Sequence, residues 1–259
     1  MSLPFVNRKP THNEIEQLRL IMSTYQDGTG MLAQAGKTLP GWRDFERSVA
    51  AAFNGQALES KWIYDVLLAD LSGIQYGISC KMRETLRTFE RTGRITIELT
   101  NASGEFWDAI KASGLTQENY DTNPDLAGAT IIRTVENWHE VVGIERGGTV
   151  DNSQSFYLVL QWEKRTERYQ LFQFPIDLPE PQSLTWEVVG RRLIGKDEQG
   201  ILIEWYGLSG GQLKYYPLVS TALWQSAVFQ LQSLPTDLEL GVRYKAATYF
   251  PELWAASRD

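Results

Sequence analysis

The stretch from Asp65 to Lys81 constrains the fold of this 259-residue chain more than any other, because it predicts two adjacent strands. Residues Ile63 to Ala69 are apolar on both sides apart from Asp65, which predicts an inner strand. Leu71-Ser72-Gly73 supplies the turn of a hairpin. In the second strand apolar and polar residues alternate, as in a strand with one buried face: Tyr76, Ile78, Cys80 and Met82 lie on one side, and Gln75, Gly77, Ser79 and Lys81 on the other.

Two charged residues in this hairpin require an explanation. Moving the Asp65 carboxylate or the Lys81 ammonium out of water costs free energy unless the charge meets an opposite charge or a metal ion. The pattern therefore predicts that Asp65 and Lys81 interact with each other or with a common ligand.

An Asp on one strand and a Lys at the end of the next, with a polar residue two positions before the Lys, resembles the core of the PD-(D/E)xK nucleases. The resemblance covers about residues 42 to 98 and implies hydrolysis of phosphodiester bonds with Mg²⁺. Asp65 is then expected to bridge the metal ion and the phosphate. Lys81 is expected to orient the attacking water or to offset negative charge that develops in the transition state.

Ser79 stands where most of these nucleases have an acid. Ser79-Cys80-Lys81 resembles a branch of type II restriction endonucleases in which a Glu on the helix after the lysine supplies the missing carboxylate. A helix is predicted from Arg83 to Thr92, and Glu90 lies on its inward side together with Leu86. The resemblance therefore implies that Glu90 is a catalytic residue and a metal ligand.

A third acid lies on the helix predicted before the hairpin, from Trp42 to Phe53. In helical projection Glu46 falls inside the apolar stripe of this helix, which consists of Trp42, Phe45, Val49 and Phe53. The edge of a helix would tolerate such a Glu, but the resemblance implies that Glu46 points at the Asp65/Lys81 site and binds metal. Another helix is expected to begin at Thr11, where Glu14 completes a capping box.

The rest of the chain predicts the fold class. A strand at Arg94–Leu99 and two further helices precede Gly147-Gly148, after which the hydrophobic period changes to two. Strands are expected at Phe156–Trp162, Tyr169–Phe174, Thr185–Ile194 and Ile201–Tyr206, followed by a helix at Leu218–Leu231 and an irregular tail. We predict an α/β or α+β fold: a restriction-endonuclease-like core of mixed sheet flanked by helices in residues 1–150, and a β-rich meander in 151–259 that continues the core.

Two groups of residues are candidates for DNA contacts. Arg83 and Arg87 lie one helical turn apart, so they either read guanine edges or form a solvated helix face. Gln212 and Lys214 lie in a glycine-rich bend that either enters a DNA groove or, as we favour, is a hairpin corner with packed aromatic residues. His139 has no nucleophile context and is expected to be structural.

Composition disfavours several classes of function. A formal net charge of −7 counts against a non-specific nucleic-acid binder, but less against a nuclease whose clustered carboxylates a cation offsets. One Cys and two His make a disulfide or a zinc site unexpected. No signal peptide and no long apolar run are found, so we expect a cytoplasmic protein without a membrane partner.

Together these features predict a sequence-specific, Mg²⁺-dependent endonuclease that cuts double-stranded DNA. A homodimer is expected, because two sites related by a two-fold axis cut both strands of a palindrome most simply. Two alternatives stay open. One is a repair or recombination nuclease that reads DNA structure, and the other is a non-catalytic interaction protein in which Asp65 and Lys81 form a buried pair.

Overall fold

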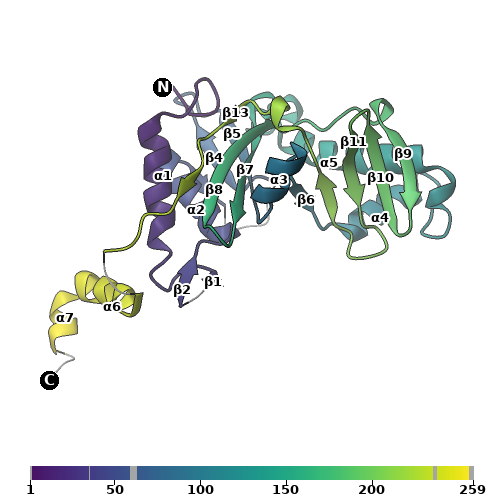
Figure 1. Cartoon of the computed structure of the whole chain (residues 1–259). Helices are drawn as coiled ribbons and strands as arrows, with labels where there is room; N and C mark the ends of the chain where they lie inside the picture. The colour runs from purple at the N-terminus through teal and green to yellow at the C-terminus, as the bar shows by residue number, and fades with distance from the viewer. Residues whose placement is uncertain (1, 35, 59–62, 236–237, 257–259) are drawn as a thin grey trace.

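The computed structural model describes residues 2–34, 36–58, 63–235 and 238–256, which form a mixed α+β fold around two large sheets (Figure 1). The predicted fold class is confirmed. The larger sheet has seven strands, in the order β13-β8-β7-β5-β4-β3, with β14 also paired to β8. Its strands are β3 (Gln56–Ala57), β4 (Val66–Ala69), β5 (Gln75–Arg83), β7 (Phe156–Glu163), β8 (Arg168–Pro175), β13 (Trp224–Gln225) and β14 (Phe229–Gln230).

The centre of this sheet joins the two halves of the sequence. The predicted hairpin is confirmed, with β4 and β5 antiparallel. On its other side β5 pairs in parallel with β7, which places Lys81 opposite Val159. Strands from both parts of the chain thus share one sheet, and the division that we placed at residues 150/151 crosses it.

The smaller sheet is antiparallel and forms a second lobe with two helices (Figure 1). Its strands are β6 (Ile97–Thr100), β9 (Thr185–Val189), β10 (Arg192–Asp197), β11 (Gly200–Trp205) and β12 (Leu213–Tyr215), in the order β6-β12-β11-β10-β9. The helices α4 (Ser103–Ala112) and α5 (Pro124–Val142) pack against it through buried residues that include Phe106, Ile132, Trp186 and Trp205. Burial of these large side chains holds the lobe together.

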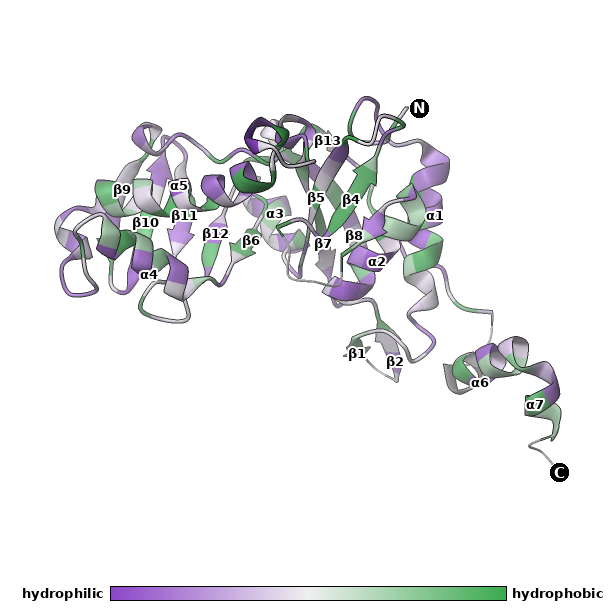
Figure 2. Cartoon of the chain, turned by 180° about the vertical axis from the view of Figure 1, so that it is seen from behind, coloured by the Kyte–Doolittle hydropathy of each residue, from purple (hydrophilic) through white to green (hydrophobic). Residues whose placement is uncertain are grey.

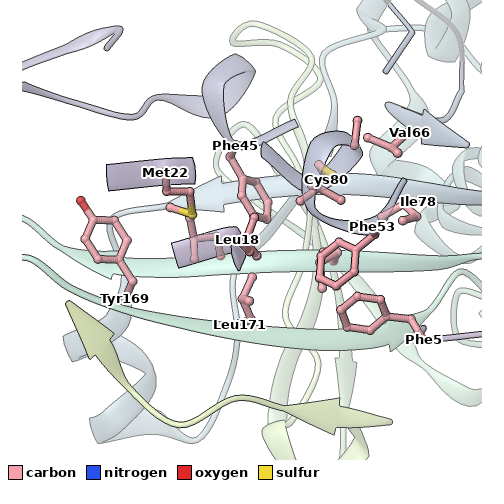
Figure 3. Close-up of a cluster of buried hydrophobic side chains, with 14 of the residues drawn as sticks. Phe5, Leu18, Met22, Phe45, Phe53, Val66, Ile78, Cys80, Tyr169 and Leu171 are labelled. Carbon is pink, nitrogen blue, oxygen red and sulfur yellow. The ribbon is translucent and has the colours of Figure 1, made fainter. Parts of the chain in front are cut away.

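The first two helices cover one face of the larger sheet. The helix α1 (His12–Thr24) begins with the predicted Thr11/Glu14 capping box, and α2 (Trp42–Phe53) has the predicted bounds. Figure 3 shows side chains of α1 and α2, such as Leu18 and Phe45, packed with Ile78 and Cys80 of β5. The apolar face of α2 and the apolar face of β5, both predicted from the sequence, thus pack together in one core.

The expectation that β5 has only one buried face is wrong. Gly77 and Ser79, on the supposedly open side, are buried as well. The ring of Tyr64 packs so closely on Gly77 that an added Cβ there would lie 2.3 Å from it. Residues of the chain between β5 and β7 and of β7 itself, including Ile97 and Tyr157, extend this second core.

Two other predicted elements have different bounds in the structure. Arg83 still belongs to β5, and the helix α3 (Leu86–Thr92) begins three residues later. A turn at Gly190, which has a φ of +63°, divides the strand predicted at Thr185–Ile194 into β9 and β10.

The helix predicted at Leu218–Leu231 is also wrong. Apart from a 3-10 turn at Val219–Thr221, the segment is extended beside β8, where Leu223 N–H donates to the Gln173 carbonyl and Ser226 N–H to that of Leu171. These bonds satisfy backbone groups at the edge of the sheet, which favours the extended form over a helix.

The tail that we expected to be irregular contains two helices, α6 (Leu238–Tyr249) and α7 (Pro251–Ala256). They project away from both sheets and carry apolar segments (Figures 1 and 2). An ion pair between Lys245 and Asp27 ties α6 to the turn that follows α1. Five large apolar side chains here are between 53% and 72% exposed: Val242, Tyr244, Tyr249, Phe250 and Leu253. Within the described ranges, no helix has the length and apolarity needed to cross a bilayer.

The packing of α5 on the smaller sheet gives a stability test. A Cβ added at Gly128 would lie 2.3 Å from the Trp186 ring. An alanine usually stabilises a helix interior relative to glycine, by about 1 kcal/mol. We nevertheless expect Gly128→Ala to lower the free energy of unfolding by about 1–3 kcal/mol, because the core there is already full. Urea unfolding of the purified variant measures this change.

Gly104→Ala is the matched control, since no atom lies within 4 Å of its added Cβ in α4. This variant should be at least as stable as the wild type. Equal stability of the Gly128 and Gly104 variants would show that the Trp186 contact does not restrict the position.

Candidate active site

Asp65 and Lys81 meet where β4 begins to pair with β5. The distance from Lys81 Nζ to Asp65 Oδ2 is 3.7 Å, which confirms the predicted proximity of the two charges. Asp65 Oδ2 also accepts a 2.7 Å hydrogen bond from Cys80 N–H, and Asp65 N–H donates to the Ile78 carbonyl. Because the regular pairing of β4 starts only at Val66, the Asp65 carboxylate gives the Cys80 amide the acceptor that the strand does not provide.

The environment of Asp65 opposes its ionisation. Burial raises the pKa of this carboxyl group above its usual value. The Lys81 charge and hydrogen bonds from Cys80, Lys81 and Ser79 act in the opposite direction without cancelling the effect of burial. Ser79, at the position of the missing acid, is buried, and its hydroxyl group is one of these hydrogen-bond donors to Asp65.

Glu46, on α2, lies within electrostatic reach of the Asp65–Lys81 pair. Burial raises its pKa to about 7, and the nearby Asp65 carboxylate adds to the shift. Lys81 is the largest of the charges that oppose the shift. Glu46 thus interacts electrostatically with both members of the pair.

The Asp65–Lys81 pair borders a cleft of about 560 Å³ between the larger sheet and the second lobe. Asp65, Ser79 and Lys81 form one wall, and the segment from Leu99 to Ala102 together with Glu105 forms another. The third wall is α5, with Val135, Trp138 and His139. A cleft that is lined by charged, hydroxyl and aromatic groups can hold a polar ligand against Asp65 and Lys81.

His139 combines packing with a position in the cleft. Its ring centroid lies 5.6 Å from that of Tyr64, which agrees with the expected structural role. Burial, assisted by the Lys81 charge, lowers the pKa of His139 to about 4, so the imidazole is neutral at physiological pH. The sequence did not indicate that this residue lines the same cleft as Lys81.

Glu90 is not part of the site, and this expectation is corrected. Its side chain is exposed on α3 and accepts two hydrogen bonds from Arg168, of 2.9 and 3.1 Å. The helix α3 begins three residues later than predicted, and Leu86 and Phe89 are the residues that pack inward. Glu90 lies about 100° around the helix from Phe89 and is exposed.

Glu105 is the carboxylate that lines the cleft in its place. Sequence reasoning missed it, because an acid in the first turn of α4 is also what favours a helix N-terminus. The first turn of α4 lies at the cleft because α4 directly follows β6, which contacts β5.

The predicted DNA-contacting residues do not form the expected groups. Arg83 ends β5 and pairs with Glu98, whereas Arg87 lies on α3 and pairs with Glu163 at 2.6 Å, so they share no helix face.

The glycine-rich bend is a corner between two strands. Lys214 lies on β12, with its Nζ 4.7 Å from the centre of the Tyr206 ring. Gln212 precedes β12, and its carbonyl accepts from Tyr206 N–H. The bend is therefore the hairpin corner that we favoured.

The carboxylates do not form a closed metal cage. Among the residues that the structure describes, no three His, Cys, Asp or Glu side chains are grouped so that they could hold a metal ion. The predicted trio of Asp65, Glu46 and Glu90 is thus not assembled. Mg²⁺ keeps several waters and needs only one or two protein carboxylates, and Asp65 with Glu46 meets that lower requirement.

Comparison with protein-family models, curated proteins and solved structures finds no match for this chain.

The raised pKa of Glu46 predicts how stability changes with pH. The unfolded chain releases the Glu46 proton near pH 4.5, and the folded protein holds it up to about pH 7. The Glu46 contribution to stability therefore falls as pH rises between these values and stays low above them. Glu46→Gln removes this loss, so it should stabilise the protein by about 1 kcal/mol near pH 8 and by much less near pH 5, as measured by urea unfolding.

Glu14→Gln is the control, because the pKa of Glu14 is lowered by folding whereas that of Glu46 is raised. Arg8 holds the pKa of Glu14 at about 2, so this carboxylate stays ionised in the folded protein over the tested range. Its replacement should destabilise the protein by a similar amount at both pH values. A Glu46→Gln effect that does not change with pH would contradict the electrostatic description of the site.

Proposed function

We propose that this protein is a Mg²⁺-dependent endonuclease of the PD-(D/E)xK type that cuts double-stranded DNA at specific sequences, as type II restriction enzymes do. The observation that carries the proposal is the Asp65–Lys81 pair on adjacent strands at the wall of a cleft, with Glu46 close by. Burial makes the ionised carboxyl groups costly in the absence of a cation, and a bound divalent cation would remove that cost.

The residues of the cleft have complementary roles in this reaction. Mg²⁺ held by Asp65 and Glu46 would polarise the scissile phosphodiester and lower the pKa of a bound water. Lys81, 3.7 Å from Asp65, orients that water and offsets the negative charge that develops on the phosphate. Ser79 hydrogen bonds Asp65 and fixes its orientation. Glu105 lines the same cleft and serves as the additional acid, the role that the sequence had assigned to Glu90.

One digestion tests the activity. Purified protein is incubated with the DNA of a sequenced phage and Mg²⁺, and the products are separated by size. Discrete fragments are expected. Cleavage confined to branched or damaged DNA would support the structure-reading nuclease instead, and a complete lack of nicking would leave Asp65 and Lys81 as a structural pair.

Substitutions in the cleft test the assigned residues. Asp65→Ala and Lys81→Ala should each reduce the cleavage rate by about three orders of magnitude or more, since a preorganised charge at such a site is worth several kcal/mol. Circular dichroism should show that both variants are folded. Near wild-type cleavage by the Asp65 variant would exclude this cleft as the active site.

The same assay compares the two candidate acids. Glu105→Ala should slow cleavage by about tenfold to a hundredfold if its carboxylate acts in the cleft. Glu90→Ala is the control, because Glu90 is exposed and pairs with Arg168 outside the cleft. A slow Glu90 variant beside an unaffected Glu105 variant would reverse this assignment.

We also propose that the active form is a homodimer, with the helices α6 and α7 forming contacts between two copies. Helices of 12 and six residues are marginal on their own, and the exposed apolar side chains here need a covering surface. A second copy is the partner that cleavage of a palindrome requires.

Light scattering after size-exclusion chromatography measures the oligomeric state. The wild type is expected at the mass of two chains, and the double variant Phe250→Asp/Leu253→Asp at the mass of one. Leu71→Asp is the control, because Leu71 is 81% exposed in the β4–β5 turn, and it should leave the dimer intact. A monomeric wild type, or an unaffected double variant, would contradict this interface.

A further inference from the structure

Three segments that are distant in the sequence are tied together at one end of the larger sheet. The first is the hairpin of β1 (Leu32–Gln34) and β2 (Lys37–Leu39), the second is the β7–β8 turn from Glu163 to Arg168, and the third is α3. Figure 1 shows the hairpin projecting beneath the ends of β7 and β8. We call the surface of these segments the basic ledge.

Specific contacts fix the arrangement of the ledge. Gln34 Nε2 donates to the Lys164 carbonyl at 2.8 Å, and Lys37 Nζ lies 2.5 Å from Glu167 Oε2. Arg87 of α3 pairs with Glu163 on the far side of the turn. A short two-stranded hairpin is unstable alone, so these contacts hold it against the turn.

The charge of the ledge is opposite to that of the whole chain. Residues 32–39, 86–92 and 163–168 contain six Lys or Arg and three Glu, a formal charge of +3 in a chain of −7. All three acids are engaged by cations of the ledge: Glu167 by Lys37, Glu90 by Arg168, and Glu163 by Arg87 and Arg168.

The remaining cations of the ledge face solvent. Lys164, Arg165 and Arg91 are exposed. No ion pair of Lys164 or Arg165 is found in the described part of the chain. Arg87 is 61% exposed although it contacts Glu163. Several cations therefore keep their capacity to bind anionic groups.

The ledge lies at the same end of the sheet as the active-site lysine. Because β5 and β7 are parallel and Lys81 is opposite Val159, both strands run toward the ledge. Glu163 follows Val159 by four residues, or roughly 13 Å of extended strand. A polyanion lying on the ledge would therefore pass near the cleft.

We propose that the basic ledge binds the phosphate backbone of duplex DNA and places the duplex over the cleft. The inference rests on the proposed nuclease function for the identity of the polyanion. The charges are spread over a hairpin, a turn and a helix, which suits a series of phosphates more than a single small anion. Such contacts fix the position of the duplex and carry no sequence information, so base reading belongs to other residues.

The salt dependence of binding tests the ledge without requiring cleavage. The affinity of the intact protein for a duplex of about 30 base pairs is measured with Ca²⁺ at several salt concentrations, by fluorescence anisotropy. Lys164→Ala/Arg165→Ala should weaken binding to every sequence alike and reduce the slope of log K against log salt by about 0.9 for each lost phosphate contact. Neither side chain supports the fold, so the variant should melt at the wild-type temperature.

Lys9→Ala/Arg133→Ala is the matched control, since both cations are exposed and belong to other parts of the chain. It should bind as the wild type does. An unchanged slope for the Lys164/Arg165 variant would overturn the ledge while leaving the cleavage test of Asp65 and Lys81 intact. Tighter binding to an RNA duplex of the same sequence would overturn the assignment to DNA.

Discussion

The parallel pairing of β5 with β7 is the interaction on which the rest of the structure depends. Two parallel neighbours cannot be joined by a tight turn, so the chain must cross from one end of the sheet to the other between Arg83 and Phe156. That crossing contains α3, β6, α4 and α5. The two helices and the first strand of the second lobe, and with them two walls of the cleft, therefore belong to this one crossing, whereas β9–β12 follow later in the chain.

The half-buried carboxylates Asp65 and Glu46 differ from a fully buried carboxylate elsewhere in the molecule. Glu204 in the second lobe is 4% exposed and accepts hydrogen bonds from Arg192, Tyr206 and Tyr216. Its charge is fully compensated, as expected of a structural group. Asp65 and Glu46 share Lys81 and keep raised pKa values, so their ionised forms lack compensation that an added cation would provide.

Local patterns predicted the elements whose stability is mostly local. Thr11 with Glu14, and the apolar stripe of α2, each combine a helix start with a buried face, so these helices followed from spacing alone. The β4–β5 hairpin followed for the same reason, and with it the contact of Asp65 and Lys81, because antiparallel pairing fixes which residues face each other. The position of Glu46 near this pair followed from its place within the apolar stripe of α2.

What the sequence alone could not provide depends on contacts between distant segments. Residues 218–231 have a helical pattern, but the open edge of β8 offers backbone partners that only the folded sheet creates, and β13 and β14 form there instead. Glu90 lies on an exposed face of α3, while the path of β6 brought Glu105 to the cleft. The sequence by itself determined the hairpin and its charged pair, through alternation and the cost of burying charge. The tertiary structure alone decided which further acid lines the cleft, because this depends on a crossing of more than seventy residues whose course no local pattern predicts.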